Sequence, residues 1–120
     1  MTAPGATKVA LVAFRGELLC FVHVLFNALD MRRRGFEVKI VLEGGSVVQA
    51  RELGQPGRPH SELFAEVCAA GLIDAVCRAC AHKMGALESC ERLGLPLRGE
   101  MQGHVPLADY VAQGYQVITF

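Results

Sequence analysis

The 120-residue sequence has no excess of either sign of charge. Twelve Lys and Arg residues balance twelve Asp and Glu residues, so the formal net charge is zero. Proteins that bind the phosphate backbone of nucleic acids present a basic surface, and this composition lacks one. We therefore expect no nucleic-acid partner.

The sequence also lacks an apolar run long enough for a membrane span, which needs about 20 residues. The longest candidate, residues 9–29, contains Arg15 and Glu17, and His23 and Asn27 interrupt the remainder. Residues 1–8 lack the basic and apolar segments of a secretory signal. We therefore expect no membrane partner and a cytoplasmic location.

Apolar residues are present in excess. Hydrophobic residues make up 52% of the chain; adding the thirteen glycines and leaving out the two tyrosines gives about 61%, above the usual level of about 45–50%. This composition excludes low-complexity disorder. Together with the length, it predicts a single domain spanning residues 1–120, with a core over about 7–120, that buries surface against copies of itself.

Five cysteines are an odd number in a chain without a recognisable export signal, so a disulfide framework is a poor explanation for them. We interpret Cys20 and Cys68 as buried thiols that act as small hydrophobic residues. Cys77 and Cys80 form a C-x-x-C pair and need a separate explanation.

Short β-rich apolar runs alternate with segments of helical periodicity along the chain. Strands are expected at residues 8–14, 36–42, 73–77, 95–98 and 115–120. Helices are expected at residues 18–34, 47–53, 61–70, 84–93 and 106–113, with Ser46 as an N-cap and Pro106 in the first turn of the last. This alternation predicts an α/β fold with a parallel sheet covered on both sides, flavodoxin-like in outline.

The expected first helix is apolar on two faces. Leu18, Val22, Leu25 and Leu29 recur at helical spacing on one face, and Leu19, His23 and Phe26 lie on another. Because a helix with two apolar faces usually has two neighbours, we interpret the second face as a subunit interface.

Ligands of open parallel sheets bind beyond the carboxyl ends of the strands, which here places three loops at the expected site: residues 15–17, 43–46 and 77–82. A thiol where a strand leads into a helix faces backbone N–H groups that favour the thiolate, and Arg78, Lys83 or a protonated His82 would add to that effect. Cys77 is therefore the candidate nucleophile and Cys80 the thiol that resolves it. The alternative is that both are inert packing residues.

A zinc site is the competing interpretation of the same cysteines. Cys77, Cys80, His82 and Cys90 can be written as one ligand set, but structural zinc sites normally pair two such knuckles, and Cys90 falls inside an expected helix. We expect no metal site and no cofactor.

The turn formed by Gly44, Gly45 and Ser46 precedes an expected helix, where backbone N–H groups can bind an anion. It matches neither glycine-rich nucleotide motif, so ordinary turn chemistry is the alternative. Glu43 is either a site acid or a solvated carboxylate. His104 either faces the same rim as Cys77 or caps the helix that follows.

Several stretches of the chain, taken in order, resemble the DsrE-like family of small sulfur-handling proteins, which includes the DsrE/DsrF and TusD/TusC subunits. The likeness covers about residues 7–120. It is carried by K-V-A-L-V-A-F (8–14), R-R-G-F-E-V-K-I-V-L-E-G-G-S-V (33–47), G-L-I-D-A-V-C-R-A-C-A (71–81) and L-A-D-Y-V-A-Q-G-Y-Q-V-I-T-F (107–120).

The resemblance implies a three-layer α/β/α domain with a mainly parallel five-stranded sheet, assembled into trimers or hexamers. It also implies a cysteine after the third main strand that carries sulfur as a persulfide between donor and acceptor proteins. Cys77 matches that position best, whereas Cys80 departs from the single-cysteine pattern: it either resolves a Cys77 persulfide or is itself the acceptor.

We therefore predict a cytosolic sulfur-relay protein that uses Cys77 and Cys80, with His82, His104 and the Gly44–Ser46 turn as binding residues. The alternatives are an oligomeric binding or scaffold subunit with a small-anion or nucleotide pocket, and a dithiol redox protein that uses the C-x-x-C pair.

Overall fold

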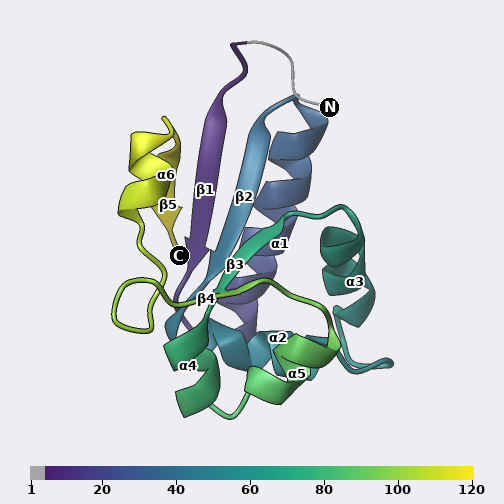
Figure 1. The fold of residues 1–120 in the computed structure, drawn as a ribbon. Coiled ribbons are helices and arrows are strands. Elements are labelled where there is room, and N and C mark those ends of the chain that lie inside the picture. Colours follow the sequence, from purple (N-terminus) through teal and green to yellow (C-terminus); the bar gives the residue numbers. More distant parts are fainter. Residues whose placement is uncertain (1–4) are drawn as a thin grey trace.

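A computed structural model describes residues 5–120 of the chain (Figure 1). Five strands form one sheet in the order β4-β3-β2-β1-β5, and every neighbouring pair is parallel. The strands are β1 (Lys8–Ala13), β2 (Glu37–Leu42), β3 (Ile73–Cys77), β4 (Leu97–Arg98) and β5 (Gln116–Thr119). The predicted five-stranded parallel sheet is confirmed.

Six α-helices and one short 3₁₀ turn connect these strands in the described part of the chain. They are α1 (Leu18–Arg33), η1 (Gly44–Ser46), α2 (Val47–Leu53), α3 (Ser61–Ala69), α4 (Arg78–Lys83), α5 (Leu87–Arg92) and α6 (Ala108–Ala112). None of the helices at residues 5–120 combines the length and the apolar character that a bilayer crossing requires.

The sheet is buried on both faces, as its unbroken apolar strands predict. On β1, Val9, Leu11 and Ala13 pack into a core that contains residues of α1, α2, α3 and α5. Ala10 and Val12 pack into a second core, beneath α6 and its flanking segments. Figure 1 shows α6 beside β5 and β1, away from α1, and the two sets of helices complete the predicted three layers.

Three of the four residues predicted on the inner face of α1, Val22, Leu25 and Leu29, are buried, together with Phe21, Val24 and Ala28. The fourth, Leu18 at the start of the helix, is 37% exposed. The helix ends where Gly35 adopts a left-handed φ of 87°. On the other face, Leu19 is 69% exposed and Phe26 is 52% exposed. The single chain therefore leaves the second apolar stripe uncovered.

The helix predicted over residues 84–93 is present but shorter, since α5 spans Leu87–Arg92. Residues 77–82 were predicted as a loop, but residues 78–83 form the short helix α4, which ends where Gly85 takes a left-handed φ of 71°. The Ala86 N–H then donates to the Ala81 carbonyl at 2.8 Å, which closes the helix end. Helix α4 begins directly after Cys77, which is its N-cap.

Two predictions concerned helix starts. Ser46 is the N-cap residue of α2, as predicted, but its hydroxyl does not cap the helix, because it donates to the carbonyls of Ala13 at 2.6 Å and Glu43 at 2.7 Å. The last helix is shorter than predicted, and Pro106 lies before its N-cap, Leu107, rather than in its first turn.

Candidate functional site

Three segments meet at the carboxyl edge of the sheet. Strands β2, β3 and β4 are neighbours and run parallel, so the residues that follow them emerge side by side. These residues are 43–46 after β2, 77–80 after β3 and 99–104 after β4. The candidate site lies where these segments converge.

Cys77 is the last residue of β3 and also the N-cap of α4, with an extended backbone (φ −62°, ψ 116°). Its side chain is 0% exposed and packs in the core on the α6 side of the sheet. Cys80 lies in the first turn of α4 and is partly exposed. The sharp change from strand to helix thus sets one thiol inside the protein and the other toward the surface.

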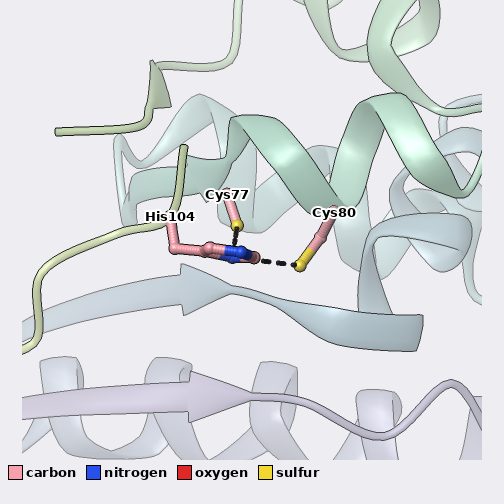
Figure 2. A group of neighbouring side chains, drawn as sticks. All are labelled: Cys77, Cys80 and His104. Carbon is pink, nitrogen blue, oxygen red and sulfur yellow. Dashed lines mark hydrogen bonds between the residues drawn. The ribbon is translucent and has the colours of Figure 1, made fainter. Parts of the chain in front are cut away.

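His104 contacts both cysteines through the same ring nitrogen. Its Nδ1 lies 3.2 Å from the Cys77 Sγ and 3.9 Å from the Cys80 Sγ. Figure 2 shows a dashed line from each sulfur atom to the imidazole ring. Because Nδ1 accepts or donates according to the tautomer, the pair holds either a thiol that donates to the ring or a thiolate that accepts from it.

A tight turn over residues 99–104 places His104 against the thiols. The Gly103 carbonyl accepts the Ala79 N–H of α4 at 2.9 Å, and the Gly103 N–H donates to the Gly99 carbonyl at 2.9 Å. Gly103 has a φ of 94°, and a Cβ there would lie 3.2 Å from the Ala79 Cβ. Only glycine suits this position, since it combines a left-handed backbone with a close approach to α4.

The hydrogen bond between Ala79 and Gly103 changes which groups can stabilise the Cys77 thiolate. Backbone N–H groups at the start of α4 were expected to favour the thiolate, but the Ala79 N–H is taken by the Gly103 carbonyl. The imidazole of His104, rather than that N–H group, is the polar group within 3.2 Å of the Cys77 sulfur. A base next to a thiol is the arrangement that activates cysteine nucleophiles.

Glu43 faces the pair from the end of β2. Burial raises the pKa of its carboxyl group, and the nearby charge of His104 lowers it in part. Burial also raises the pKa of Cys80, and the Cys77 thiol adds to that rise, whereas the Gly44 backbone N–H lowers it. At neutral pH these effects favour a protonated Cys80 thiol.

The predicted binding turn is closely packed. Gly44 has a φ of 54°, and a Cβ there would lie 2.9 Å from the Phe14 ring; the Gly45 backbone lies against that of Gly16. The Ser46 N–H donates to the carbonyls of Phe14 and Glu43, and its hydroxyl also donates to backbone carbonyls. Ser46 therefore serves the fold, while the Gly44 backbone acts to lower the pKa of Cys80. Anion binding by Gly44, Gly45 and Ser46 stays a prediction.

The structure does not bring together every residue that the sequence suggested. His82 is exposed in the last turn of α4, and the residues grouped with Cys77 and Cys80 include His104 rather than His82. Cys90 is buried in α5 within the core on the α1 side. The ligand set of Cys77, Cys80, His82 and Cys90 therefore does not form.

A separate hollow of about 880 Å³ lies beside α3. It is lined by residues 53–58 and 60–65 together with Cys68 and Leu93. None of the predicted site residues lines it. The Cys77–His104 pair therefore stands apart from this hollow.

The DsrE/DsrF-like family matches residues 19–120, most of the chain and all of the site. The chain belongs to this family. A relative of this DsrE/DsrF-like protein, an uncharacterized protein of Methanocaldococcus jannaschii, is 32% identical over 120 residues, covering 95% of this chain and 96% of the relative. The resemblance drawn from the sequence is confirmed.

A solved structure of a conserved protein of unknown function from Bacteroides thetaiotaomicron has the same fold as this DsrE/DsrF-like chain. The TM-score is 0.68 at 19% identity, covering 99% of this chain and 100% of that one. This likeness supports the fold alone.

Sequence reasoning identified Cys77, Cys80 and His104 in the DsrE/DsrF-like chain but missed the turn that joins them. Gly99 and Gly103 carry the signal, since two glycines separated by three residues follow a predicted strand that neighbours the one ending at Cys77. A parallel sheet brings such a segment to the same edge.

Proposed function

We propose that this protein is a sulfur carrier that holds a transferable sulfur atom as a persulfide on Cys77. Two observations support the proposal: membership of the DsrE/DsrF-like family and the 3.2 Å contact between the Cys77 Sγ and the His104 Nδ1. The contact is the main support, because the thiolate is the nucleophilic form of cysteine and an adjacent imidazole can remove the proton of the thiol.

Loading is a transfer of sulfane sulfur between two thiolates. His104 accepts the Cys77 proton, and the Cys77 thiolate attacks the terminal sulfur of a donor persulfide, R–S–SH. The donor S–S bond breaks as the Cys77 Sγ–S bond forms, leaving Cys77–S–SH and the donor thiolate R–S⁻. An acceptor thiolate unloads the protein by the same reaction in reverse, so the cycle consumes no external reductant.

Cys80 is the auxiliary thiol of this cycle. Its sulfur and that of Cys77 lie within 4.8 Å of each other. If its thiolate attacks the Cys77 Sγ, a Cys77–Cys80 disulfide forms and HS⁻ leaves. Because burial and Cys77 raise the pKa of Cys80, the thiol form protects the persulfide near neutral pH.

Because Cys77 is buried, a partner protein must displace part of the structure to reach it. With a side chain that is 0% exposed, Cys77 accepts sulfur from a protein donor only when the His104 segment shifts. His104 itself is exposed and its turn lies at the surface edge of the sheet, so a docking partner contacts this segment first. Donor and acceptor proteins are the partners that this cycle needs.

Sulfur loading followed by intact-mass measurement tests the proposal. Reduced protein is treated with polysulfide, desalted and weighed, in parallel with the Cys77→Ser variant and with a Cys20→Ser variant as the matched control. We expect the wild type and Cys20→Ser to gain the mass of one sulfur atom and Cys77→Ser to gain none. An adduct of equal yield on Cys77→Ser would overturn the assignment to Cys77.

Dithiol redox chemistry is the second candidate, favoured by the proximity of the two sulfur atoms. It requires a Cys77–Cys80 disulfide that forms and reopens at cellular thiol potentials. Equilibration with glutathione buffers, read by alkylation and mass, separates the two functions. A redox protein cycles between dithiol and disulfide without sulfur donors, whereas a carrier exchanges sulfur without net oxidation.

We also propose that copies of this chain associate through the outer face of α1. Leu19 and Phe26 present large apolar side chains on this face, and an apolar stripe of this kind commonly marks an interaction surface. Family resemblance favours trimers or hexamers. Light scattering tests the association, and a strict monomer at micromolar concentration contradicts it.

A further inference from the structure

The same three side chains form a ligand set for a metal ion. The Cys77 Sγ, the Cys80 Sγ and the His104 Nδ1 all lie within 4.8 Å of one another. They come from two segments, since the cysteines flank the start of α4 and His104 follows the turn over residues 99–104. We propose that Cys77, Cys80 and His104 bind a thiophilic cation, Zn²⁺, with one coordination position left for an external ligand.

The distances suit tetrahedral zinc. Bonds of about 2.3 Å to sulfur and about 2.0 Å to nitrogen place a sulfur and a nitrogen ligand about 3.5 Å apart. His104 Nδ1 lies 3.2 Å from one sulfur atom and 3.9 Å from the other, so both sulfur-to-nitrogen distances are close to this value. Figure 2 shows both sulfur atoms directed at the nitrogen that would share the ion.

The ligand chemistry selects the class of metal. Two thiolates and an imidazole favour zinc and other soft ions, whereas Mg²⁺ and Ca²⁺ require oxygen ligands. On binding, Cys77 and Cys80 each release a proton, and their two negative charges balance the dication. The carboxylate of Glu43 lies close enough for its charge to act on Cys80 and His104, which adds to the attraction for a cation.

The surroundings hold the ligands in place and leave the outer side open. The Gly103 carbonyl accepts the Ala79 N–H at 2.9 Å, which ties the His104 turn to the helix that carries Cys80. Cys77 is buried, Cys80 is partly exposed and His104 is exposed, so the fourth position faces the surface. Three protein ligands with an accessible fourth position resemble a catalytic zinc site more than a closed structural one.

Metal binding and sulfur carriage exclude each other at this site. A bound zinc ion would take one lone pair of each thiolate and the lone pair of the His104 nitrogen that would otherwise accept the Cys77 proton. This consequence rests on the proposed function, whereas the metal site itself does not. Zinc would thus hold the carrier in an unloaded state and shield both thiols from oxidation.

Titration of the reduced, sulfur-free, untagged protein with Co²⁺ tests the metal site directly. We expect one equivalent to produce the thiolate-to-cobalt charge-transfer band, Zn²⁺ to displace the cobalt, and two of the five thiols to become protected from alkylation. The absence of the band, or protection of Cys20 and Cys68 in place of Cys77 and Cys80, would overturn the proposal.

Variants assign the ligands. Cys77→Ser, Cys80→Ser and His104→Gln should each weaken Zn²⁺ binding at least about tenfold, a loss that changes outside the ligand shell already cause. His82→Gln and Cys68→Ser are matched controls and should bind as the wild type does. Because Cys77 is buried and its variant is the one most prone to misfold, Cys80→Ser and His104→Gln decide the outcome; unchanged affinity in both contradicts the site.

A final comparison separates this inference from the proposed function. Protein loaded with Zn²⁺ should take up no sulfur from polysulfide, and removal of the zinc by a chelator should restore uptake. A cobalt band without any sulfur uptake by the metal-free protein would refute the carrier function alone. Sulfur uptake without a cobalt band would refute the metal site alone.

Discussion

The Cys77 sulfur lies 3.2 Å from His104 Nδ1, although the two residues are 27 positions apart in the sequence. The contact joins the end of β3 to the turn that follows β4, and it sets a base beside a buried thiol. The predictions below follow from this pair and from the groups around it.

Replacing the imidazole of His104 should slow the reaction of Cys77 with polysulfide. In His104→Gln the side chain keeps a similar length but cannot accept the thiol proton as imidazole does. Because positioned bases contribute about 10²–10⁴-fold, we expect Cys77 to react at least about tenfold more slowly with polysulfide at neutral pH. Peptide mass spectrometry of timed samples measures the rate. His82→Gln is the control on α4, and equal rates in all three proteins would remove His104 from the mechanism.

The Gly103 turn should be needed for the site as well as for the fold. Gly103→Ala forces a side chain into a left-handed backbone, at a cost of about 1–2 kcal/mol, and brings its Cβ to 3.2 Å from the Ala79 Cβ. We therefore expect a lower free energy of unfolding, measured by denaturant titration, and a slower reaction of Cys77, measured by sulfur uptake.

Gly94→Ala is the matched control for this variant. Gly94 has a φ of 70°, but a Cβ there would meet no atom within 4 Å, so the substitution adds backbone strain without touching the site. Gly94→Ala should lose stability to a similar extent, but its Cys77 should take up sulfur at the wild-type rate. Equal loss of rate in both variants would show that the effect of Gly103→Ala comes from general destabilisation.

Glu43 should make stability depend on pH. Because burial raises its pKa in the folded state above 4.5, the folded protein holds this proton more tightly than the unfolded chain. The contribution is present below the unfolded pKa and is lost as the pH rises through the folded pKa. We expect Glu43→Gln to gain stability relative to the wild type as the pH rises from about 4.5 toward neutral.

Denaturant titrations across this pH range measure the difference between the two proteins. Glu66→Gln changes an exposed carboxylate on α3 and is the control. Its free energy of unfolding should depend on pH in the same way as that of the wild type. A Glu43→Gln curve that also runs parallel to the wild type would contradict the burial of this carboxyl group.

The outer face of α1 should control assembly. Leu19→Glu places a charge in the exposed apolar stripe, so we expect the oligomer to dissociate toward monomer in light scattering. Val111→Glu changes a similarly exposed apolar residue on α6, where Val111 is 65% exposed, and should leave the mass unchanged. Dissociation of Val111→Glu but not of Leu19→Glu would place the interface on α6 and contradict the proposal.

The sequence was sufficient to predict the sheet and the inner face of α1, because unbroken apolar strands and a helical stripe are local patterns. Helix α4 was missed and taken as a loop over residues 77–82, since a helix of six residues is too short to show periodicity, and the Ala86–Ala81 hydrogen bond that closes it is not visible in the sequence. Local periodicity does not report such closing contacts.

The site was predicted in part for a similar reason. Cys77 and Cys80 could be suggested because their spacing is local, and His104 because it lies beside the start of the helix expected at Pro106, where capping that helix was the alternative role. His82 was suggested because it is close to the cysteines in sequence; it is exposed in the last turn of α4 and is not among the side chains grouped with Cys77 and Cys80. The contact of His104 with Cys77 depends on strand order, which spacing alone does not define.

The most direct test of the central claim is to locate the sulfur atom after loading. Wild-type protein is treated with polysulfide, alkylated, digested without reductant and mapped by mass spectrometry. The account predicts a persulfide on the peptide carrying Cys77, absent when His104 is replaced by glutamine at short times. A persulfide found on Cys20, Cys68 or Cys90, with Cys77 unmodified, would contradict it.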